Sequence, residues 1–252
     1  QKGREVTDFD GLTAIVTGGA SGLGAATARM LRARGATVAV LDRDITALPD
    51  DAFGVPCDVT VDDQVSDAIA TVGRRFGAID IVINNAGVGA AGDVAANADD
   101  EWMRVFDVNV IGIARVTRAA LPFLRASAHG AVVNTSSVVA SVGVRNRALY
   151  SASKGAVSAL TLAMAADHVA DGVRVNAVAP GTADTPWVTR LLESSEDPAA
   201  AEAALRSRQP MGRLVTPDEV ASAIVYLASP SASSTTGVIL PVDGGMAGVR
   251  VV

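Results

Sequence analysis

The stretch Thr17-Gly18-Gly19-Ala20-Ser21-Gly22-Leu23-Gly24 decides the fold of this chain. Before it lies Leu12–Thr17, a short apolar run rich in β-branched residues, which is typical of a buried strand. After it, Ala25–Arg34 carries helix-forming residues and stops at Gly35, as helices often do. A glycine-rich turn between a strand and a helix lets the phosphates of a dinucleotide approach the backbone N–H groups at the helix N-terminus. A glycine pattern alone is weak evidence, but the strand before it and the helix after it are the context that the motif requires.

Strand and helix alternate along the rest of the chain in the same way. Short runs of consecutive apolar residues, without alternating polar residues, predict strands that are covered on both faces. The expected strands are Thr37–Leu41, one near Val55, Ile79–Ile83, Ala131–Thr135, Val173–Val178 and one near Val238–Val242, and the expected helices are Asp63–Phe76, Glu101–Leu124, Ala148–Val169 and one near Asp218–Ala228. This alternation predicts an α/β fold, with a single doubly wound parallel sheet (Rossmann fold) of about seven strands and helices on both faces.

We expect a flexible, polar N-terminus over residues 1–10 and a single domain over residues 11–252. The segment 186–213 interrupts the alternation, because it contains Pro186, Pro198 and Pro210 and mixes Ala-rich pieces with charges. A surface helical insertion would explain this composition. Its position after the carboxyl end of a strand, where α/β sheets bind ligands, favours a lid over a binding cleft.

Composition excludes several classes of protein. Of the 252 residues, 49% are hydrophobic and 19% are charged, which suits a packed core rather than a disordered chain. The formal net charge is −6 and no dense Lys/Arg stripe is present, so we expect no nucleic-acid partner. No apolar run approaches the roughly 18–20 residues of a membrane span, so we expect no membrane partner. Cys57 is the only cysteine, which fits a reducing, cytoplasmic compartment, and we expect it to be a small core residue on a strand rather than a reactive thiol.

The residues that carry chemistry lie at Tyr150-Ser151-Ala152-Ser153-Lys154, on an expected helix. Tyr150 and Lys154 are four positions apart and therefore project from one helix face. Tyrosine is a poor base near its usual pKa of about 10, and a neighbouring ammonium lowers that pKa. The pair alone is a weak signal, because chance pairs on helices are common. The only histidines, His129 and His168, have no metal-ligand spacing, so we expect no metal and no histidine-based triad.

Asp42 closes the second expected strand, 18 residues after Gly24. A carboxylate at this place can accept hydrogen bonds from the adenosine ribose hydroxyls of NAD, and it repels the 2′-phosphate of NADP. Arg43 beside it could pair with that phosphate, or could stack on adenine or lie in solvent. The position of Asp42 favours NAD, with NADP as the less favoured cofactor.

Across essentially its whole length the sequence resembles the classical short-chain dehydrogenase/reductase family. The matching motifs, in chain order, are Thr17–Gly24, Asp58-Val59, Asn84-Asn85-Ala86-Gly87, Asn109, Ser137, Tyr150-x-x-x-Lys154, Pro180-Gly181 with Thr185, and Asp243-Gly244-Gly245. Any one of these could be accidental, but the ordered set could not.

The resemblance implies the catalytic roles. Tyr150 would be the general acid in reduction and the general base in oxidation. Lys154 would hold the nicotinamide ribose and lower the Tyr150 pKa, and Ser137 would hydrogen-bond the substrate oxygen. Asn109 would anchor a water that links Lys154 to solvent. Ser136 is equally polar, but the family's serine directly precedes the segment that matches Val138-Val139-Ala140, which selects Ser137.

The resemblance also implies a set of cofactor-binding residues. These are Gly18, Ser21, Gly22, Leu23 and Gly24 in the turn; Asp42, Arg43, Asp58 and Val59 at the adenosine; Asn85, Ala86 and Gly87 at the central ribose; Tyr150 and Lys154; and Pro180, Gly181, Ala183 and Thr185 at the nicotinamide. Ala183 is smaller than the family's usual aliphatic residue, so that contact would be looser. Asn85 and Asn109 could equally serve structure, at a turn and at a helix kink, since the family uses both in that way as well.

Candidate substrate residues are Ser137, Arg147, Trp187 and Arg208. Arg147 lies three residues before Tyr150, and Arg208 lies in the expected lid. The surrounding sequence resembles the branch of cytosolic 3-hydroxybutyrate and keto-deoxy sugar-acid dehydrogenases, in which arginines bind a substrate carboxylate. Exposed arginines are also commonly just solvated. Trp187 and Met246 could wall the pocket or belong to the core or an interface.

The sequence thus predicts an NAD-dependent oxidoreductase that interconverts a secondary alcohol and a ketone, on a small hydroxy acid or sugar acid. The alternatives are a carbonyl or 3-oxoacyl thioester reductase of the same family, and a catalytically silent binding protein on the same fold. The expected helix Ala148–Val169 has a small-residue face beyond what one sheet needs to cover, formed by Ser158, Ala159, Leu162, Ala163 and Ala166. Together with the resemblance, which implies that the two long helices pair across two-fold axes, this face leads us to expect a homotetramer. The substrate, its stereochemistry and the physiological direction do not follow from the sequence.

Overall fold

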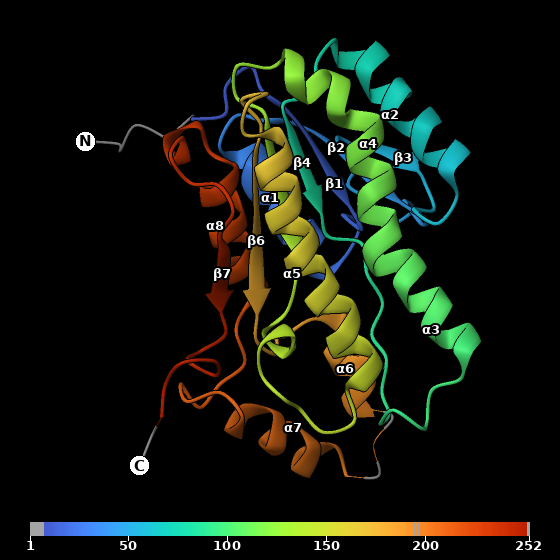
Figure 1. Ribbon diagram of the computed structural model, residues 1–252, viewed down its shortest axis with the longest axis vertical. Helices are drawn as coiled ribbons and strands as arrows, with labels where there is room; N and C mark the ends of the chain where they lie inside the picture. Colours follow the sequence, from blue (N-terminus) through green and yellow to red (C-terminus); the bar gives the residue numbers. More distant parts are fainter. Residues whose placement is uncertain (1–7, 194, 196, 251–252) are drawn as a thin grey trace.

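The computed structural model describes residues 8–193, 195 and 197–250, with only the backbone of Trp187, Arg190 and Leu191. Within them, seven parallel strands form one sheet in the order β3-β2-β1-β4-β5-β6-β7 (Figure 1). The strands are β1 (Thr13–Thr17), β2 (Thr37–Asp42), β3 (Phe53–Pro56), β4 (Ile81–Asn84), β5 (Ala131–Thr135), β6 (Arg174–Pro180) and β7 (Ile239–Val242). The predicted α/β fold with a doubly wound parallel sheet is confirmed.

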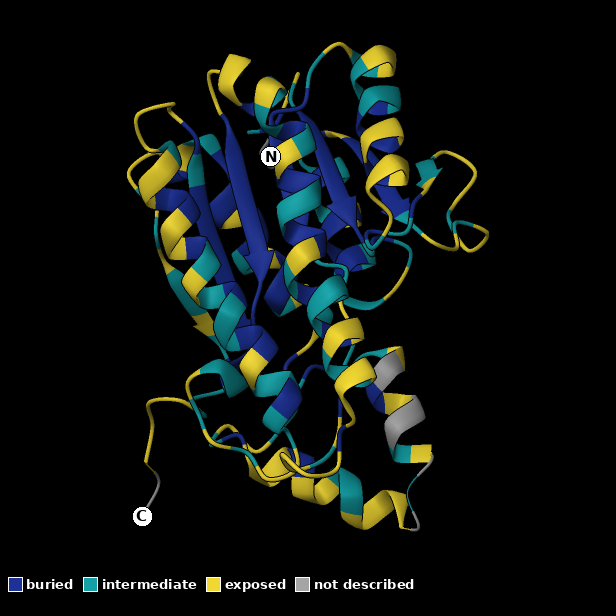
Figure 2. Ribbon diagram, turned by 45° about the vertical axis from the view of Figure 1, so that its right-hand side comes forward, coloured by how far each residue is buried: buried dark blue, intermediate teal, exposed yellow. Residues whose placement is uncertain are grey.

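The helices cover the sheet on both faces. They are α1 (Gly22–Ala33), α2 (Asp62–Phe76), α3 (Asp99–Phe106), α4 (Gly112–Ala126), α5 (Ala148–His168), α6 (Pro186–Glu193), α7 (Pro198–Ser207) and α8 (Pro217–Ala228), with short helical turns η1 (Asp107–Ile111), η2 (Val138–Ala140) and η3 (Pro230–Ala232). Side chains alternate along each strand, so Ala14 and Val16 pack under α1 and α8 while Ile15 packs under α2, α4 and α5. Figure 2 shows the strands buried and the outer helix faces exposed.

The expected helix Glu101–Leu124 is divided by a turn of π-helix at η1. Asn109 lies in this turn and is fully buried. Its side chain accepts a hydrogen bond from the Val88 N–H at 2.8 Å and donates one to the Val88 carbonyl at 2.9 Å. These bonds tie Asn109 to Val88, which lies 21 residues earlier in the chain, beyond the carboxyl end of β4. The helix takes the wider turn because the bonds hold Asn109 in this position.

The first residues that the structure describes pack against the rest of the domain. Within the segment 1–10, which the sequence predicts to be flexible, Phe9 is fully buried and Asp8 makes two hydrogen bonds with the Arg34 guanidinium, both at 2.9 Å. Residues 1–7 lie outside the described part of the chain. Cys57 is buried as expected, but it lies one residue beyond β3 rather than on a strand. Burial raises the pKa of its thiol to about 11, which agrees with an unreactive side chain.

The carboxyl ends of the strands define the functional edge of the molecule. In Figure 1 the strands point toward α6 and α7, which lie beyond this edge and fall within the segment 186–213. Among the described residues, no helix is both long and apolar enough to cross a membrane.

Candidate active site

A cleft of about 860 Å³ opens at the carboxyl edge of the sheet. Its walls come from the segments that follow β1, β2, β4, β5 and β6, and from α5, α6 and α7. Parallel α/β sheets bind ligands at this edge, beside the point where the strand order reverses, which here lies between β1 and β4. The cleft therefore collects motifs that are distant in sequence.

The glycine turn after β1 forms one end of the cleft. Gly18 adopts a left-handed backbone (φ 63°), and a Cβ atom there would lie 2.9 Å from the Ala86 Cα. At Gly24 a Cβ atom would lie only 2.1 Å from the Gly18 carbonyl oxygen. No side chain larger than hydrogen fits at either position, so the backbone of the turn stays open to a ligand.

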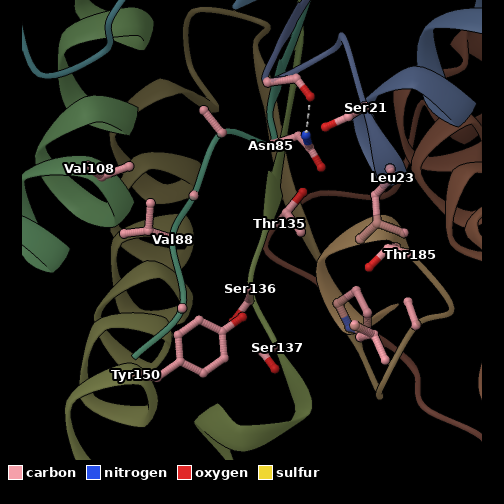
Figure 3. Close-up of a pocket in the computed structure, with 18 of the residues that line it drawn as sticks. Ser21, Leu23, Asn85, Val88, Val108, Thr135, Ser136, Ser137, Tyr150 and Thr185 are labelled. Carbon is pink, nitrogen blue, oxygen red and sulfur yellow. Dashed lines mark hydrogen bonds between the residues drawn. The ribbon is translucent and has the colours of Figure 1, made fainter. Parts of the chain in front are cut away.

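The same turn leads into the N-terminus of α1. Ser21 is the N-cap of α1, yet its side chain makes no capping hydrogen bond. The first N–H groups of a helix need an acceptor from outside the helix, and a pyrophosphate supplies one. Asn85 lies just beyond β4, and its side chain reaches the turn (Figure 3). It donates to the carbonyl oxygens of Thr17 at 3.1 Å and Gly18 at 3.0 Å. The residues present fit the diphosphate of a nicotinamide dinucleotide.

Asp42 ends β2 and lines the cleft next to this turn. One carboxylate oxygen, Oδ2, accepts a hydrogen bond from the Ala20 N–H at 3.0 Å, which fixes the side chain. Arg43 is mostly exposed and lies 4.0 Å from the Asp58 carboxylate across the cleft mouth. Charges and hydrogen bonds from Arg43 and Thr60 hold the Asp58 pKa below its ordinary value, although burial acts the other way. The end of the cleft at which the resemblance places the adenosine therefore carries two carboxylates, Asp42 and Asp58.

Tyr150 and Ser137 face one another in the middle of the cleft (Figure 3). Ser137 lies just beyond β5 at the start of η2, and Tyr150 lies in the first turn of α5. Burial raises the Tyr150 pKa, while a hydrogen bond from Ser137 and the charge of Arg147 act to lower it. A hydroxyl paired with a phenol in a cleft suits proton transfer to or from a bound oxygen atom.

Lys154 lies behind this pair rather than in the open cleft. It is 4% exposed, and its Nζ donates to the Thr135 carbonyl oxygen at 2.7 Å. The Nζ atom lies 5.8 Å from the centre of the Tyr150 ring. Burial lowers the Lys154 pKa to about 8, so its ammonium persists at neutral pH and is lost above pH 8. In this structure Ser137 and Arg147 act to lower the Tyr150 pKa. The lowering of that pKa by Lys154 stays a prediction from the sequence.

Asn109 and Gly24 also lie beneath the cleft surface. A Cβ atom at Gly87 would lie 3.3 Å from the Asn109 Oδ1 and 3.5 Å from the Lys154 Nζ, so these three residues form one cluster. The remaining cofactor candidates line the cleft: Gly18, Ser21, Gly22, Leu23, Asp42, Arg43, Asp58, Val59, Asn85, Ala86, Gly87, Tyr150, Pro180, Gly181, Ala183 and Thr185.

Arg147 and Arg208, the two candidate substrate arginines, line the same cleft. So does Met246, from the segment after β7. Trp187 belongs to α6, but its side chain is outside the described part of the chain. The other walls near these residues are apolar, formed by Val139, Val144, Val188 and Leu205.

Sequence reasoning missed two supporting residues. Ser153 is fully buried; its hydroxyl accepts from the Asn109 amide at 3.1 Å and donates to the Tyr150 carbonyl oxygen at 2.8 Å. The backbone carbonyl of Thr135 receives the Lys154 ammonium. Ser153 could have been found from its place inside the Tyr150–Lys154 motif, whereas a backbone acceptor leaves no sequence signal. In the described part of the chain, no group of three or more His, Cys, Asp or Glu side chains could hold a metal.

Comparisons with known proteins agree with this geometry. A family model described as enoyl-(acyl carrier protein) reductase matches residues 18–247. The chain is 42% identical over 253 residues to cis-4-hydroxycyclohexanecarboxylate dehydrogenase of Sinomonas cyclohexanicum, covering 94% of this chain and 96% of that relative. It is 36% identical over 248 residues to a 3-oxoacyl-[acyl-carrier-protein] reductase of Thermotoga maritima, covering 94% and 98%.

Among solved structures, the ligand-free aldohexose dehydrogenase of Thermoplasma acidophilum superposes with a TM-score of 0.92 at 34% identity, covering 99% of this chain and 98% of that one. The names of these three proteins indicate a cyclic hydroxy acid, an acyl thioester and a sugar as substrates. The reaction type is shared and the substrate is not. None of the three is a 3-hydroxybutyrate dehydrogenase, so the resemblance to that narrower branch stays a prediction.

Proposed function

Because this chain belongs to the short-chain dehydrogenase/reductase family, we propose that it is an NAD-dependent dehydrogenase that oxidises the secondary alcohol of a small hydroxy acid. Family membership makes it an oxidoreductase that acts on CH–OH groups and uses NAD or NADP. The single observation that carries the narrower proposal is the charge of the cleft. Its acidic residues, Asp42 and Asp58, line the end next to the glycine turn, where we expect the adenosine, and Arg147, whose charge acts on the Tyr150 phenol, lines the cleft together with Arg208.

Each residue of the site has its own role in alcohol oxidation. Ser137 hydrogen-bonds the substrate oxygen and Tyr150 accepts its proton. Lys154 and Asn109 are both buried. The Lys154 Nζ lies 5.8 Å from the centre of the Tyr150 ring, and Asn109 is linked through the Ser153 hydroxyl to the Tyr150 backbone carbonyl. When bound, the dinucleotide supplies the acceptor for the hydride.

The walls of the cleft favour a hydroxy acid with an apolar carbon skeleton over a sugar acid. A sugar needs a hydrogen-bond partner for most of its hydroxyls, whereas Val139, Val144 and Val188 offer none. Arg147 offers a guanidinium, which pairs well with a carboxylate. The relative from Sinomonas cyclohexanicum, named for a cyclic hydroxy acid, supports this substrate class.

The proposal is tested by following NADH absorbance with a panel of substrates and both cofactors. The panel contains cis-4-hydroxycyclohexanecarboxylate, 3-hydroxybutyrate, sugar acids, neutral sugars and simple secondary alcohols. We expect the highest kcat/KM for a hydroxy acid with NAD. Efficient turnover confined to neutral sugars would overturn the substrate class.

Asp42→Ala is expected to narrow the preference for NAD over NADP. The substitution removes the acceptor for the ribose hydroxyls and the charge that repels a 2′-phosphate. Loss of hydrogen bonds to a charged group, worth about 1.5–3 kcal/mol, corresponds to a roughly 10–150-fold loss of kcat/KM with NAD. The measurement is kcat/KM for both cofactors in both proteins. A wild-type enzyme that already prefers NADP would show the assignment to be wrong.

A second candidate function is the reduction of a 3-oxoacyl thioester. The 36% identity with a 3-oxoacyl-[acyl-carrier-protein] reductase favours it. Asp42 argues against it, because reductive members of the family commonly use NADPH. Turnover of an acetoacetyl thioester with NADPH, at a rate above that of every hydroxy acid with NAD, would select this candidate.

The protein is expected to assemble as a homotetramer, as the family resemblance implies. On α5 the small or apolar residues Ala159, Leu162, Ala163 and Ala166 are exposed, and on the neighbouring α3 and η1 so are Met103 and Ile111. An apolar helix face of this kind is stabilised by a matching face across a two-fold axis. Light scattering over a dilution series measures the assembly, and a stable monomer would contradict it.

A further inference from the structure

Asp58 and Val59 line the cleft where the resemblance places the adenosine, and we call this pair the adenosine wall. It belongs to the short segment between β3 and α2. The Asp58 Oδ1 accepts hydrogen bonds from the Thr60 N–H at 2.9 Å and from the Thr60 hydroxyl at 2.7 Å. The Oδ2 atom lies 4.0 Å from the Arg43 Nη1, which is beyond hydrogen-bond distance, and no residue that the structure describes donates to it. This oxygen therefore has lone pairs left for a ligand.

Arg115 reaches the adenosine wall from α4, although it is not among the residues that line the cleft. Its Nη1 donates to the Val59 carbonyl oxygen at 3.2 Å and to the Asp107 Oδ1 at 2.7 Å. The Arg115 side chain is only 18% exposed. A partly buried ion pair is screened by solvent and salt much less than an exposed one. Asp107 therefore holds the guanidinium in place against the Val59 carbonyl.

The backbone of α4 packs against the same residue. A Cβ atom at Gly112 would lie 2.9 Å from the Val59 Cγ2 and 3.1 Å from the Val59 Cβ. A glycine at this position allows α4 to approach Val59 closely. Val59 is thus held at two points, at its side chain by the α4 backbone and at its carbonyl oxygen by Arg115.

Arg115 also acts on the charge of Asp58. Burial acts to raise the Asp58 pKa, but hydrogen bonds from Thr60 and the charges of Arg43 and Arg115 hold it below its ordinary value. An ionised carboxylate only accepts hydrogen bonds. It suits a base edge that donates, as the 6-amino group of adenine does, and it opposes a base edge that carries a carbonyl oxygen at the same place.

The π-helical turn η1 supports the adenosine wall and the middle of the cleft together. Asp107 begins the turn and anchors Arg115. The next residue, Val108, lines the cleft (Figure 3). Asn109 follows and is bonded to the backbone of Val88, which lines the cleft as well. The position of Arg115 is therefore set by the same turn that holds Asn109.

We propose that Arg115, anchored by Asp107, is a positioning residue that makes the cleft selective for adenine. It acts through the adenosine wall, by holding the Val59 backbone and the neighbouring Asp58 carboxylate where the 6-amino group of adenine can donate to the free Oδ2. The inference rests on the dinucleotide site of the proposed function and is independent of its substrate. A base with a carbonyl oxygen at position 6, such as hypoxanthine, gains no hydrogen bond from this arrangement.

The test measures two dissociation constants by nicotinamide fluorescence, without any alcohol substrate. The ligands are NADH and the reduced nicotinamide hypoxanthine dinucleotide. Arg115→Met keeps the aliphatic stem and removes the guanidinium. It should weaken NADH binding roughly tenfold, the equivalent of about one net hydrogen bond, and should change binding of the hypoxanthine analogue little. Arg115→Lys should recover part of the NADH affinity, because one ammonium can donate to both oxygens.

Arg118→Met is the matched control. Arg118 lies on the same helix and pairs with Asp62 at 2.6 Å, at the start of α2, but both side chains are mostly exposed and neither lines the cleft. This variant should leave both dissociation constants unchanged. Asp107→Asn, which removes only the anchoring charge, should narrow the preference for adenine less than Arg115→Met does. It should add nothing in the double variant, since Asp107 acts through Arg115.

Equal losses for NADH and the hypoxanthine analogue, or a loss in Arg118→Met as large as in Arg115→Met, would overturn the role of Arg115. If Arg115→Met does not fold, Asp107→Asn and Arg115→Lys provide the same comparison. A wild type that prefers NADH over the analogue through Arg115, yet oxidises no hydroxy acid, would retain this inference and refute the proposed substrate class. A wild type that oxidises hydroxy acids and binds both dinucleotides equally would retain the reaction and refute the inference. Binding of neither dinucleotide would refute both.

Discussion

Replacing Tyr150 with Phe is expected to lower turnover by roughly 10²–10⁴-fold while leaving NADH binding intact. The substitution keeps the ring, which packs in a small cluster with Val105 and Leu149, and removes only the hydroxyl that faces Ser137. Cofactor binding relies on the glycine turn and Asp42 on the other side of the cleft, so it should persist. The measurements are kcat for alcohol oxidation and the dissociation constant of NADH by fluorescence.

The pH profile provides the control for this assignment. Oxidation needs Tyr150 as its phenolate, and the Tyr150 pKa in this structure lies above its ordinary value. The rate of oxidation in the wild type should therefore rise with pH through the neutral and alkaline range, and the residual rate of Tyr150→Phe should not. Near-normal turnover in the variant, or the same alkaline rise, would remove Tyr150 from the chemistry.

The parts of the site that sequence could predict are those set by local geometry. The turn Gly18–Gly24 needs a strand before it and a helix after it, and both are visible as runs of residue type. Tyr150 and Lys154 share a face because of the helical period, and Asp42 ends a strand whose apolar run is four residues long. Such features depend on neighbours in the chain, so a single sequence contains them.

The parts that could not be predicted depend on contacts between distant segments. The π-helical turn at η1 follows from the hydrogen bonds between Asn109 and Val88, not from the helix-forming residues around it. Phe9 is buried because the start of the chain packs with α1 and α8, which a polar terminal sequence does not indicate. The approach of Arg208 to the cleft depends on where α7 packs.

Lys154 shows what helical spacing leaves open. Its spacing from Tyr150 predicts a neighbouring ammonium that lowers the phenol pKa. In the folded chain, burial lowers the pKa of Lys154 itself to about 8, and the charge of Arg147 also acts to lower the Tyr150 pKa. Helical spacing gives the proximity of two side chains, whereas their charge states depend on the depth of burial, which only the assembled sheet and helices determine.

The last prediction concerns Gly24, where a single methyl group is expected to destroy the cofactor turn. In Gly24→Ala the new Cβ would lie 2.1 Å from the Gly18 carbonyl oxygen and 2.5 Å from the Asn85 side-chain nitrogen, and the first of these is backbone that must shift. Overpacking of this kind costs about 1–3 kcal/mol, which lowers Tm by roughly 2–12 °C for a chain of this size. Displacing the turn by about 1 Å also misplaces the phosphate-binding N–H groups, so catalytic efficiency with NAD should fall on the order of 10²-fold.

Gly155→Ala on α5 is the matched control, because a Cβ there meets nothing within 4 Å and Ala favours a helix by about 0.5–1 kcal/mol. That variant should keep or raise Tm and bind NADH normally. If both substitutions lower Tm alike, or if Gly24→Ala binds NADH as the wild type does, the close packing of the turn is not what holds the cofactor.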